Sequence, residues 1–545
     1  MVAQGERNMP SRGPRPPIRR LMPIIAAALG TIQAIAAPLA TADAADTTTP
    51  IKYLVVIYQE NVSFDHYFAT YPHAENAPGE PAFHPRPGTP TVNGLSGVLL
   101  SRNPNSSPPF RLDRSRAATC DQDHEYKAEQ RAYDHGLVDK AVDFTGTASM
   151  TNQGTTACHP GDVMGYFDGN TVTALWNYAQ YFAMSDNHFA TTFGPSTPGA
   201  LNLIAGQTHG AVGDCGMAAP SVGCVATADS LITSFGVDIV HNTIIGDVRP
   251  KLDDCSSRET AEMSGRNVGN LLSENSVTWG FFQGGFKPTG MNAGKAVCGA
   301  SHTGSNGLPR NDYIPHHQPF QYYRSTSNPH HLPPTSPGVI GTNEDQANHQ
   351  YDLSDFWDTV EAHNLPHVTF LKAPGYQDGH AGYSDPLSEQ HYLVETINRL
   401  QRLPEWESMA IIIAYDDSDG WYDHVMPPIV RTSNTPQDAL TGEGSCGQSA
   451  SGSVQGRCGF GPRLPLLIVS PWAKRNFVDH TLIDQTSILR FIEDNWRLGR
   501  LGNGSTDEVA GSLGNMFDFA KPHRVMLLLD PASGQRISGA PGAED

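Results

Sequence analysis

Short apolar runs that alternate with stretches of helical periodicity constrain the fold of this 545-residue chain more than any other feature. The runs are rich in β-branched residues and occupy residues 51–58, 368–371, 409–415 and 464–469. Such runs are typical of strands buried on both faces. Apolar residues recur at helical spacing in residues 171–183, 353–363, 387–403 and 483–496. The alternation predicts an α/β fold with a mostly parallel central sheet and helices on both faces.

Local signals refine this prediction at helix ends and in loops. Ser354 precedes an apolar helical pattern and is a predicted N-cap. Three segments rich in Gly, Pro, Ser and Asn are predicted to be long loop excursions around the site, at residues 72–109, 284–337 and 432–461.

The N-terminus has the pattern of an export signal. Arginines at positions 12, 15, 19 and 20 precede a largely apolar stretch, residues 21–40, and then Ala42-Asp43-Ala44. We expect residues 1–44 to be a signal peptide, by the Sec or the twin-arginine route, and residues 45–545 to be a single catalytic domain. No later run is long enough to predict a transmembrane segment. The predicted location is periplasmic or extracellular.

The cysteine content agrees with export, and the charge limits the possible partners. The formal net charge is −20, which argues against a nucleic-acid backbone as the main partner. The eight cysteines form an even number, which favours disulfides in an exported chain. The spacings between Cys215 and Cys224 and between Cys446 and Cys458 favour short loop crosslinks over a zinc site.

Two acidic clusters follow two predicted buried strands. Glu60-Asn61 comes directly after the first strand, and Asp416-Asp417 comes directly after the run at 409–415. Ligands of open α/β sheets bind at the carboxyl ends of strands. These four oxygen-bearing side chains are therefore candidate ligands of one divalent cation of unknown identity.

A turn rich in small residues and proline lies between these clusters. In Gly194-Pro195-Ser196-Thr197-Pro198, Ser196 precedes an apolar helical stretch. Spacing alone leaves two interpretations of Ser196 open. It is either an N-cap, the more frequent case, or a hydroxyl held at a helix N-terminus where an anionic phosphate is favoured.

Five motifs in order carry a resemblance to a known family. They are Glu60 to Phe68, the Pro195–Pro198 turn, Pro315 to Tyr323, Asp378-Gly379-His380, and Asp416 to His424. Together they resemble the bacterial phospholipase C and acid phosphatase family of the alkaline-phosphatase-like superfamily, over about residues 51–497. The resemblance implies an alkaline-phosphatase-like fold.

The resemblance also implies roles for individual residues. Ser196 would be the nucleophile, and the metal ligands would be Glu60, Asn61, Ser196, Asp416 and Asp417. The phosphate and its leaving group would contact Asn61, His124, His380 and one of His316 or His317, with His317 taken as the catalytic one. His66 and His424 are expected to be hydrogen-bonding bystanders. The chain departs from many relatives at Gly199, where they carry Asn.

The function implied is a secreted, metal-dependent phosphoric ester hydrolase that acts through a phosphoserine. The late acidic pair and the short segment after Trp496 favour a broad-specificity acid phosphatase for small phosphate esters. The alternative is a phospholipase C that converts phosphatidylcholine-type phospholipids to diacylglycerol and a phosphorylated head group. A non-catalytic secreted metal-binding or adhesion protein is a minor alternative.

Overall fold

The computed structural model describes residues 46–146, 158–216, 223–234, 236–448 and 451–538. Residues 44–545 form one compact unit. The predicted signal peptide lies outside the described residues, and the assignment of 45–545 to a single catalytic domain stays a prediction. No helix in the described part of the chain combines the length and apolar character that a bilayer crossing requires.

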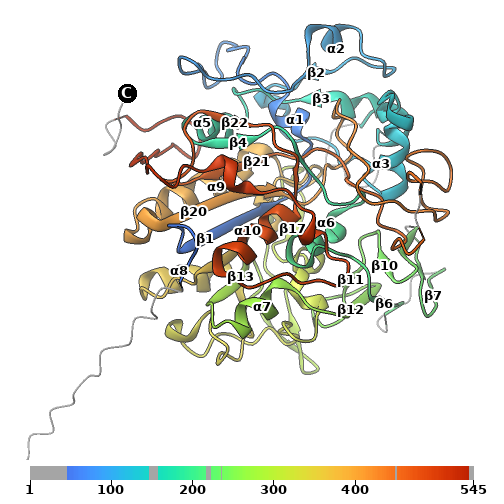
Figure 1. Cartoon of the computed structure of the whole chain (residues 1–545), viewed down its shortest axis with the longest axis vertical. Coiled ribbons are helices and arrows are strands. Elements are labelled where there is room, and N and C mark those ends of the chain that lie inside the picture. Colours follow the sequence, from blue (N-terminus) through green and yellow to red (C-terminus); the bar gives the residue numbers. More distant parts are fainter. Residues whose placement is uncertain (1–45, 147–157, 217–222, 235, 449–450, 539–545) are drawn as a thin grey trace, which may run out of the picture. The chain divides into compact units, whose positions relative to one another are not determined.

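An eight-stranded sheet lies at the centre of this unit (Figure 1). In spatial order its strands are β18 (Gln350–Asp352), β13 (Trp279–Gln283), β19 (Val368–Lys372), β1 (Tyr53–Gln59), β20 (Met409–Tyr415), β21 (Leu466–Val469), β4 (Ala183–Ser185) and β22 (Phe477–Asp479). Neighbouring strands run parallel except where β21 pairs antiparallel with β20 and β4. The predicted mostly parallel sheet is therefore confirmed.

The four predicted strands form the middle of this sheet. β1 and β20 lie side by side in parallel register, from Tyr53 opposite Met409 to Gln59 opposite Tyr415. All seven residues of β20 are buried, as its continuous apolar run requires. The sequence analysis missed β13, β18, β4 and β22, because three of them have only three residues and β13 is an aromatic Trp-Gly-Phe-Phe-Gln segment.

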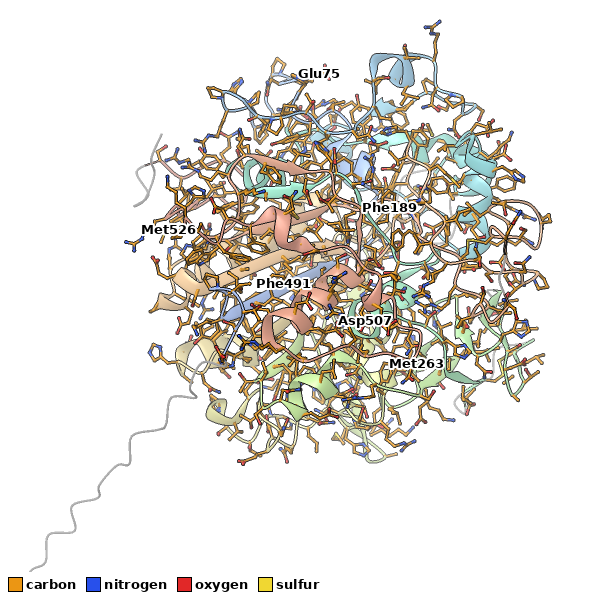
Figure 2. All side chains as sticks on the ribbon, in the orientation of Figure 1. Glu75, Phe189, Met263, Phe491, Asp507 and Met526 are labelled. Atoms are coloured by element: carbon orange, nitrogen blue, oxygen red, sulfur yellow. A yellow bond between two sulfur atoms is a disulfide. The ribbon has the colours of Figure 1, made fainter. Side chains whose placement is uncertain are left out.

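The main helices form two packed groups. α6 (Ser196–Ala205) contacts α7 (Val268–Glu274) and α10 (Thr486–Trp496), whereas α5 (Thr173–Tyr181) contacts α9 (Pro386–Leu400). α8 (Leu353–Glu361) packs on β13 and β18. Side chains fill the space between elements (Figure 2), and Phe491 of α10 stacks on Phe517 with ring centroids 5.3 Å apart.

Two helix starts differ from the sequence prediction. Asp352, not Ser354, is the N-cap of α8, because its carboxylate accepts the Ser354 N–H at 2.9 Å in a capping box with Asp355. Helix α10 begins at Thr486 rather than 483, because β23 (Ile483–Asp484) pairs with β5 (His188–Phe189).

The strands outside the central sheet form small sheets, and several helices are short. The antiparallel hairpins of segment 284–337 are β14 (Gly290–Asn292) with β15 (Lys295–Val297), and β16 (Ser301–Thr303) with β17 (Pro309–Asn311). A three-stranded sheet joins β11 (Arg249–Pro250), β12 (Thr260–Met263) and β6 (Ala211–Asp214). A four-stranded sheet contains β7 (Val225–Ala226), β8 (Leu231–Ile232), β9 (Val237–Val240) and β10 (Thr243–Ile244). A further two-stranded sheet pairs β2 (Phe110–Arg111) with β3 (Gly165–Tyr166). The remaining α-helices are α1 (Phe64–Phe68), α2 (Gly97–Ser101), α3 (Tyr126–Ala132) and α4 (Ala141–Phe144).

All eight cysteines form disulfides, as the sequence predicts. Two bonds, Cys215–Cys224 and Cys446–Cys458, are the expected short crosslinks. The other two, Cys120–Cys158 and Cys255–Cys298, join residues 38 and 43 positions apart. These longer crosslinks fasten separate loops to one another.

Helix α6 approaches the end of β20 unusually closely at Gly199. A Cβ on Gly199 would lie 2.1 Å from the main-chain oxygen of Asp416, which is well inside van der Waals contact. The Gly199 carbonyl accepts a hydrogen bond from Tyr58 Oη at 3.0 Å, and this bond ties the helix to β1. The structure therefore leaves no room for a side chain at position 199, and glycine fits there.

We predict that Gly199→Ala lowers the free energy of unfolding by about 1–3 kcal/mol, because helix or strand must shift to admit the methyl group. Urea unfolding measures this change. Gly97→Ala is the matched control, since a Cβ there would have no atom within 4 Å. Equal stabilities of the two variants would contradict the close approach.

Candidate active site

The parallel register of β1 and β20 brings the two predicted acidic clusters together. Glu60 and Asn61 follow β1, and Asp416 and Asp417 follow β20. The Asn61 N–H donates to Asp416 Oδ1 at 3.0 Å, and all four residues are buried. The four side chains therefore meet at the carboxyl edge of the sheet, as expected.

Asn61 has a left-handed backbone, with φ of 52°, which asparagine tolerates better than most residues. Its side chain lies between two other candidate residues. Oδ1 is 3.3 Å from Ser196 Oγ, and Nδ2 is 3.3 Å from His124 Nε2.

Ser196 is the first residue of α6, and Pro195 is the N-cap. The N-cap interpretation of Ser196 is therefore wrong. Its hydroxyl faces the acidic cluster instead, with Oγ 3.0 Å from Glu60 Oε2 and 3.1 Å from Asp417 Oδ2. Neighbouring Thr197 is turned away, because its Oγ1 lies 3.4 Å from both the Val248 carbonyl and Tyr322 Oη.

The arrangement of oxygen atoms around Ser196 Oγ is better explained by a bound cation than by hydrogen bonds alone. A hydroxyl donates one hydrogen, yet three acceptor oxygens surround Ser196 Oγ at 3.0–3.3 Å. Burial, more than the neighbouring Asp416 carboxylate, raises the pKa of Glu60 well above its usual value, and burial also raises that of Asp417. Asp416 Oδ2 is buried and has no hydrogen-bond partner among the residues that the structure describes. A hard divalent ion accepts such oxygen ligands.

Lys372 is an unpredicted member of this cluster. It ends β19, and its buried ammonium contacts Glu60 Oε1 and lies 3.8 Å from Asp416 Oδ2. Burial alone would lower the pKa of Lys372, but Glu60 and Asp416 outweigh burial and raise it. The chain therefore supplies one positive charge to the acidic cluster itself.

The two adjacent histidines occupy different positions. His317 Nδ1 lies 3.1 Å from Glu60 Oε1, whereas His316 Nε2 lies 3.7 Å from Asp247 Oδ2. Burial, with a smaller effect of His316, lowers the pKa of His317 well below its usual value. Burial and Asp247 act in opposite directions on His316, whose pKa is lowered to about 3.

His124 and His380 lie on the other side of Asn61, with ring centroids 6.0 Å apart. Burial would lower the pKa of His124, but Asp417 and Asp419 outweigh burial and raise it well above the usual value. Burial, and then His124, lower the pKa of His380. Among the four histidines considered for contact with the phosphate, His124, His316, His317 and His380, only His124 therefore favours the charged form.

His66 and His424 belong to the packing around the site. His66 Nδ1–H donates to the Gly165 carbonyl at 2.7 Å, and the ring stacks on Trp421 with centroids 3.9 Å apart. His424 Nδ1 lies 2.6 Å from Asp65, whose carboxylate also pairs with buried Arg463. These contacts agree with the bystander role expected for both histidines.

A cavity of about 510 Å³ opens beside His124, His316 and His380. Most of its lining is charged or polar, and Tyr383 contributes an aromatic wall. Three arginines from separate segments line it, namely Arg249, Arg258 and Arg310. Lys372 directly follows the predicted strand 368–371, but its place in the sequence does not show which groups its ammonium meets. The three arginines lie in or near short strands without a recognisable sequence pattern, so they were not predicted.

Three groups of side chains in the described residues place at least three potential metal-ligand atoms within 4.8 Å of one another. The predicted ligand set is not among them. One group, Asp121, His124, His380 and Asp419, borders the cavity. Asp65, Asp423 and His424 surround Arg463, and the third group consists of Cys255, Cys298 and His331.

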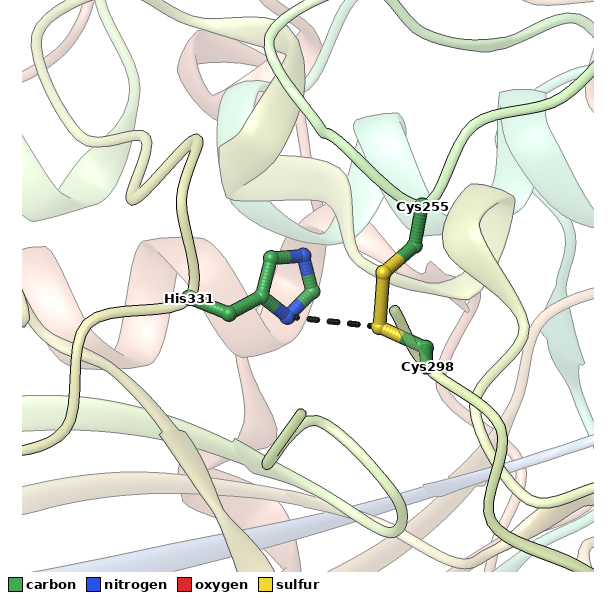
Figure 3. Close-up of side chains that lie close together, drawn as sticks. All are labelled: Cys255, Cys298 and His331. Carbon is green, nitrogen blue, oxygen red and sulfur yellow. Dashed lines mark hydrogen bonds between the residues drawn. A yellow bond between two sulfur atoms is a disulfide. The ribbon is translucent and has the colours of Figure 1, made fainter. Parts of the chain in front are cut away.

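The third group is no metal site, because its two sulfur atoms are bonded to each other (Figure 3). His331 Nδ1 lies 3.6 Å from Cys298 Sγ, and its Nε2 lies 2.9 Å from Asp253 Oδ1. The disulfide joins the loop before β12 to the segment after β15, and both border the cavity.

Comparison with known proteins identifies the family. The family model described as Phosphoesterase family matches residues 51–499. The chain belongs to this family. The match covers both acidic clusters, Ser196, Lys372 and the histidines around the cavity. Family membership and the relatives below support a hydrolase that acts on phosphoric ester bonds.

The curated relatives include bacterial phospholipases. The chain is 24% identical to a non-hemolytic phospholipase C of Pseudomonas aeruginosa, over 87% of this chain and 58% of that protein. It is 26% identical to a non-hemolytic phospholipase C of Burkholderia pseudomallei, over 90% of this chain and 62% of that protein. It is 24% identical to phospholipase C A of Mycobacterium tuberculosis, over 87% of this chain and 78% of that protein. The chain thus spans less than two thirds of the first two relatives.

Among solved structures, a protein in the alkaline phosphatase superfamily from Vibrio parahaemolyticus is 11% identical. The likeness covers 62% of this chain and 65% of that chain, with a TM-score of 0.26. At that score it carries no argument about fold or function.

We predict that Lys372→Met lowers the free energy of unfolding by about 3–5 kcal/mol in chelator, because it leaves buried carboxylates without their ammonium partner. A divalent cation should restore part of the loss by replacing that charge. Urea unfolding with EDTA and then with excess Mg²⁺, Ca²⁺ or Mn²⁺ measures both effects.

Lys251→Met is the control for Lys372→Met. Lys251 pairs with Asp214 at 2.8 Å on the surface, where loss of an ion pair costs about 1 kcal/mol or less. Two results would contradict the role of Lys372 as the positive partner of Glu60 and Asp416. One is an equal loss of unfolding free energy in both variants, and the other is a Lys372→Met protein that no divalent cation stabilises.

Proposed function

We propose that the protein is a metal-dependent phosphomonoesterase that transfers the phosphoryl group to Ser196 and then to water. The contact of Ser196 Oγ with Glu60, Asn61 and Asp417 carries this proposal. A hydroxyl held among buried acceptors, beside a cavity with histidine walls, has the position a nucleophile needs.

The proposed metal ligands are Glu60, Asn61, Ser196, Asp416 and Asp417. When bound there, one divalent cation would supply Lewis-acid stabilisation of a phosphoryl oxygen and favour ionisation of the serine hydroxyl. Its identity is open. The geometric support is the surplus of acceptor oxygens around Ser196 Oγ.

Asn61 and His124 are proposed to hold the phosphoryl oxygens. His124 Nδ1 faces the Gln122 carbonyl at 2.9 Å, so this nitrogen carries a hydrogen. Because the pKa of His124 is raised, Nε2 is protonated as well and faces the amide Nδ2 of Asn61. Two donors directed at the same place call for an anionic acceptor, which a phosphoryl oxygen supplies.

His317 and His380 are proposed to act in the neutral form. Their lowered pKa values leave each ring with one donor and one acceptor nitrogen near pH 6. His380 Nδ1 lies 2.6 Å from the Ala381 carbonyl, which directs Nε2 elsewhere as an acceptor. His380 is thus suited to accept a proton from the water that cleaves the phosphoserine.

We predict that Ser196→Ala lowers kcat by at least about 10³-fold while the protein still folds, because the covalent route is lost. Hydrolysis of p-nitrophenyl phosphate measures activity, and thermal unfolding checks the fold. Thr197→Ala is the neighbouring control. If Ser196→Ala keeps near-normal turnover and Thr197→Ala loses it, the nucleophile is Thr197 and the assignment to Ser196 is wrong.

A phospholipase C is the second candidate, because the three relatives described above are phospholipases C. The cavity lining argues for small polar esters instead, since arginines and carboxylates border the histidines. Diacylglycerol would need an apolar rim at this place. The acidic charge of the chain also disfavours adsorption to anionic bilayers.

We predict higher kcat/KM for aryl or nucleotide monoesters than for phosphatidylcholine, at about pH 5.5 to 6.5. Activity should fall as pH rises through the raised pKa of His124, because the histidinium is lost. Parallel assays on one preparation, with and without chelator, measure this preference. Faster release of phosphocholine from lipid would favour the phospholipase C, and full activity after metal removal would exclude the proposed cation.

A further inference from the structure

The charged cavity extends beyond the groups that the phosphoryl transfer needs. Arg249 lies in β11, Arg258 in the loop before β12, and Arg310 in β17, and all three line the same space as His124, His316 and His380. The nucleophile is close by, because His124 contacts Asn61 and Asn61 contacts Ser196. A substrate with its phosphoryl group at Ser196 would extend toward the arginines.

Two of the guanidinium groups keep unused donors. Nε of Arg249 and Nε of Arg310 are buried and have no hydrogen-bond partner in the described part of the chain. Both side chains are nevertheless held in place. Arg249 Nη1 donates to Ser257 Oγ at 2.6 Å, and the Arg310 guanidinium lies 3.6 Å from the Tyr383 ring centroid. Fixed groups with unused donors are suited to bind an anion.

The three arginines also repel one another. Burial first, and then Arg258 and Arg310, lower the pKa of Arg249 to about 10. Two carboxylates border the cavity, but each already faces other groups. Asp247 accepts the Thr197 N–H at 3.0 Å and lies 3.7 Å from His316, and Asp121 lies 3.8 Å from His124. A bound anion would relieve the repulsion among the guanidinium groups.

The scaffold fixes the arginine-bearing segments relative to each other. Figure 3 shows the disulfide between Cys255 and Cys298. It joins the loop of Arg258 to the segment that leads into the β16–β17 hairpin, which carries Arg310. The Cys255 N–H donates to Asp253 Oδ1 at 2.7 Å, and the same carboxylate is paired with buried His331. The cavity wall is therefore crosslinked as well as charged.

We propose that Arg249, Arg258 and Arg310 form a second anion subsite that binds a phosphate or carboxylate on the leaving group of the ester. This inference rests on the proposed function and narrows its substrate class. The favoured substrates are small phosphomonoesters whose alcohol carries a second negative group. Glycerol 3-phosphate and 3-phosphoglycerate form a matched pair that differs in this group.

Calorimetric titration of the Ser196→Ala protein with each compound, at fixed ionic strength, tests the subsite without turnover. We expect 3-phosphoglycerate to bind at least about tenfold more tightly, because charged hydrogen bonds to guanidinium are among the strong ones. Adding Arg310→Met should bring the two affinities close together, and Arg310→Lys should keep part of the difference. Arg258→Met gives an independent measurement should Arg310→Met fail to fold.

Arg324→Met is the matched control, because Arg324 is exposed and pairs with Glu262 at 2.8 Å outside the cavity lining. It should leave the affinity ratio unchanged. Equal affinities for the two compounds, or a ratio that the cavity arginine variants leave intact, would overturn the proposal. Monoester hydrolysis by the wild-type protein would then still support the proposed function. An arginine-dependent ratio without any monoester hydrolysis would keep the subsite and reject the phosphomonoesterase.

Discussion

The pairing of β1 with β20 is the constraint on which the site depends. Their parallel register places Gln59 opposite Tyr415, so the next residues of both strands leave the sheet at the same edge. If the register of one strand slipped by one residue, every side chain of that strand would change face. Glu60 would then no longer meet the Asp416-Asp417 pair. The pairing of the two buried strands thus determines which side chains meet at the candidate site.

Concentrating carboxylates at that edge has an electrostatic cost that the structure offsets locally. Buried carboxylates resist ionisation unless positive charge or hydrogen bonds accompany them. Lys372 supplies one such charge from β19, the strand on the other side of β1. Asn61, which follows Glu60 after β1, and Ser196 at the start of α6 complete the polar environment. The same arrangement holds the Ser196 hydroxyl against Glu60, Asn61 and Asp417.

The sequence predicted the parts of the site that are coded locally. Glu60, Asn61, Asp416 and Asp417 directly follow recognisable strands, and the proline turn around Ser196 has its own pattern. Lys372 reads as an ordinary strand residue, and its role depends on which strands become neighbours. The arginines come from three segments that only the tertiary fold and a disulfide bring together. Ser354 failed as an N-cap because the helix already begins at Leu353 and Asp352 caps it, so Ser354 lies in the first turn and donates its own N–H to Asp352.

The antiparallel strand β21 has a consequence for how such a site can diversify. β20 ends at Tyr415, and β21 begins at Leu466, opposite Ala414. A parallel partner would have required the chain to cross to the far edge of the sheet before returning. Here the connecting residues leave and re-enter at the edge of the sheet that carries the candidate site, without such a crossing. Changes in the length of this connection can therefore alter access to the candidate site while the strand order and the positions of the site residues stay the same.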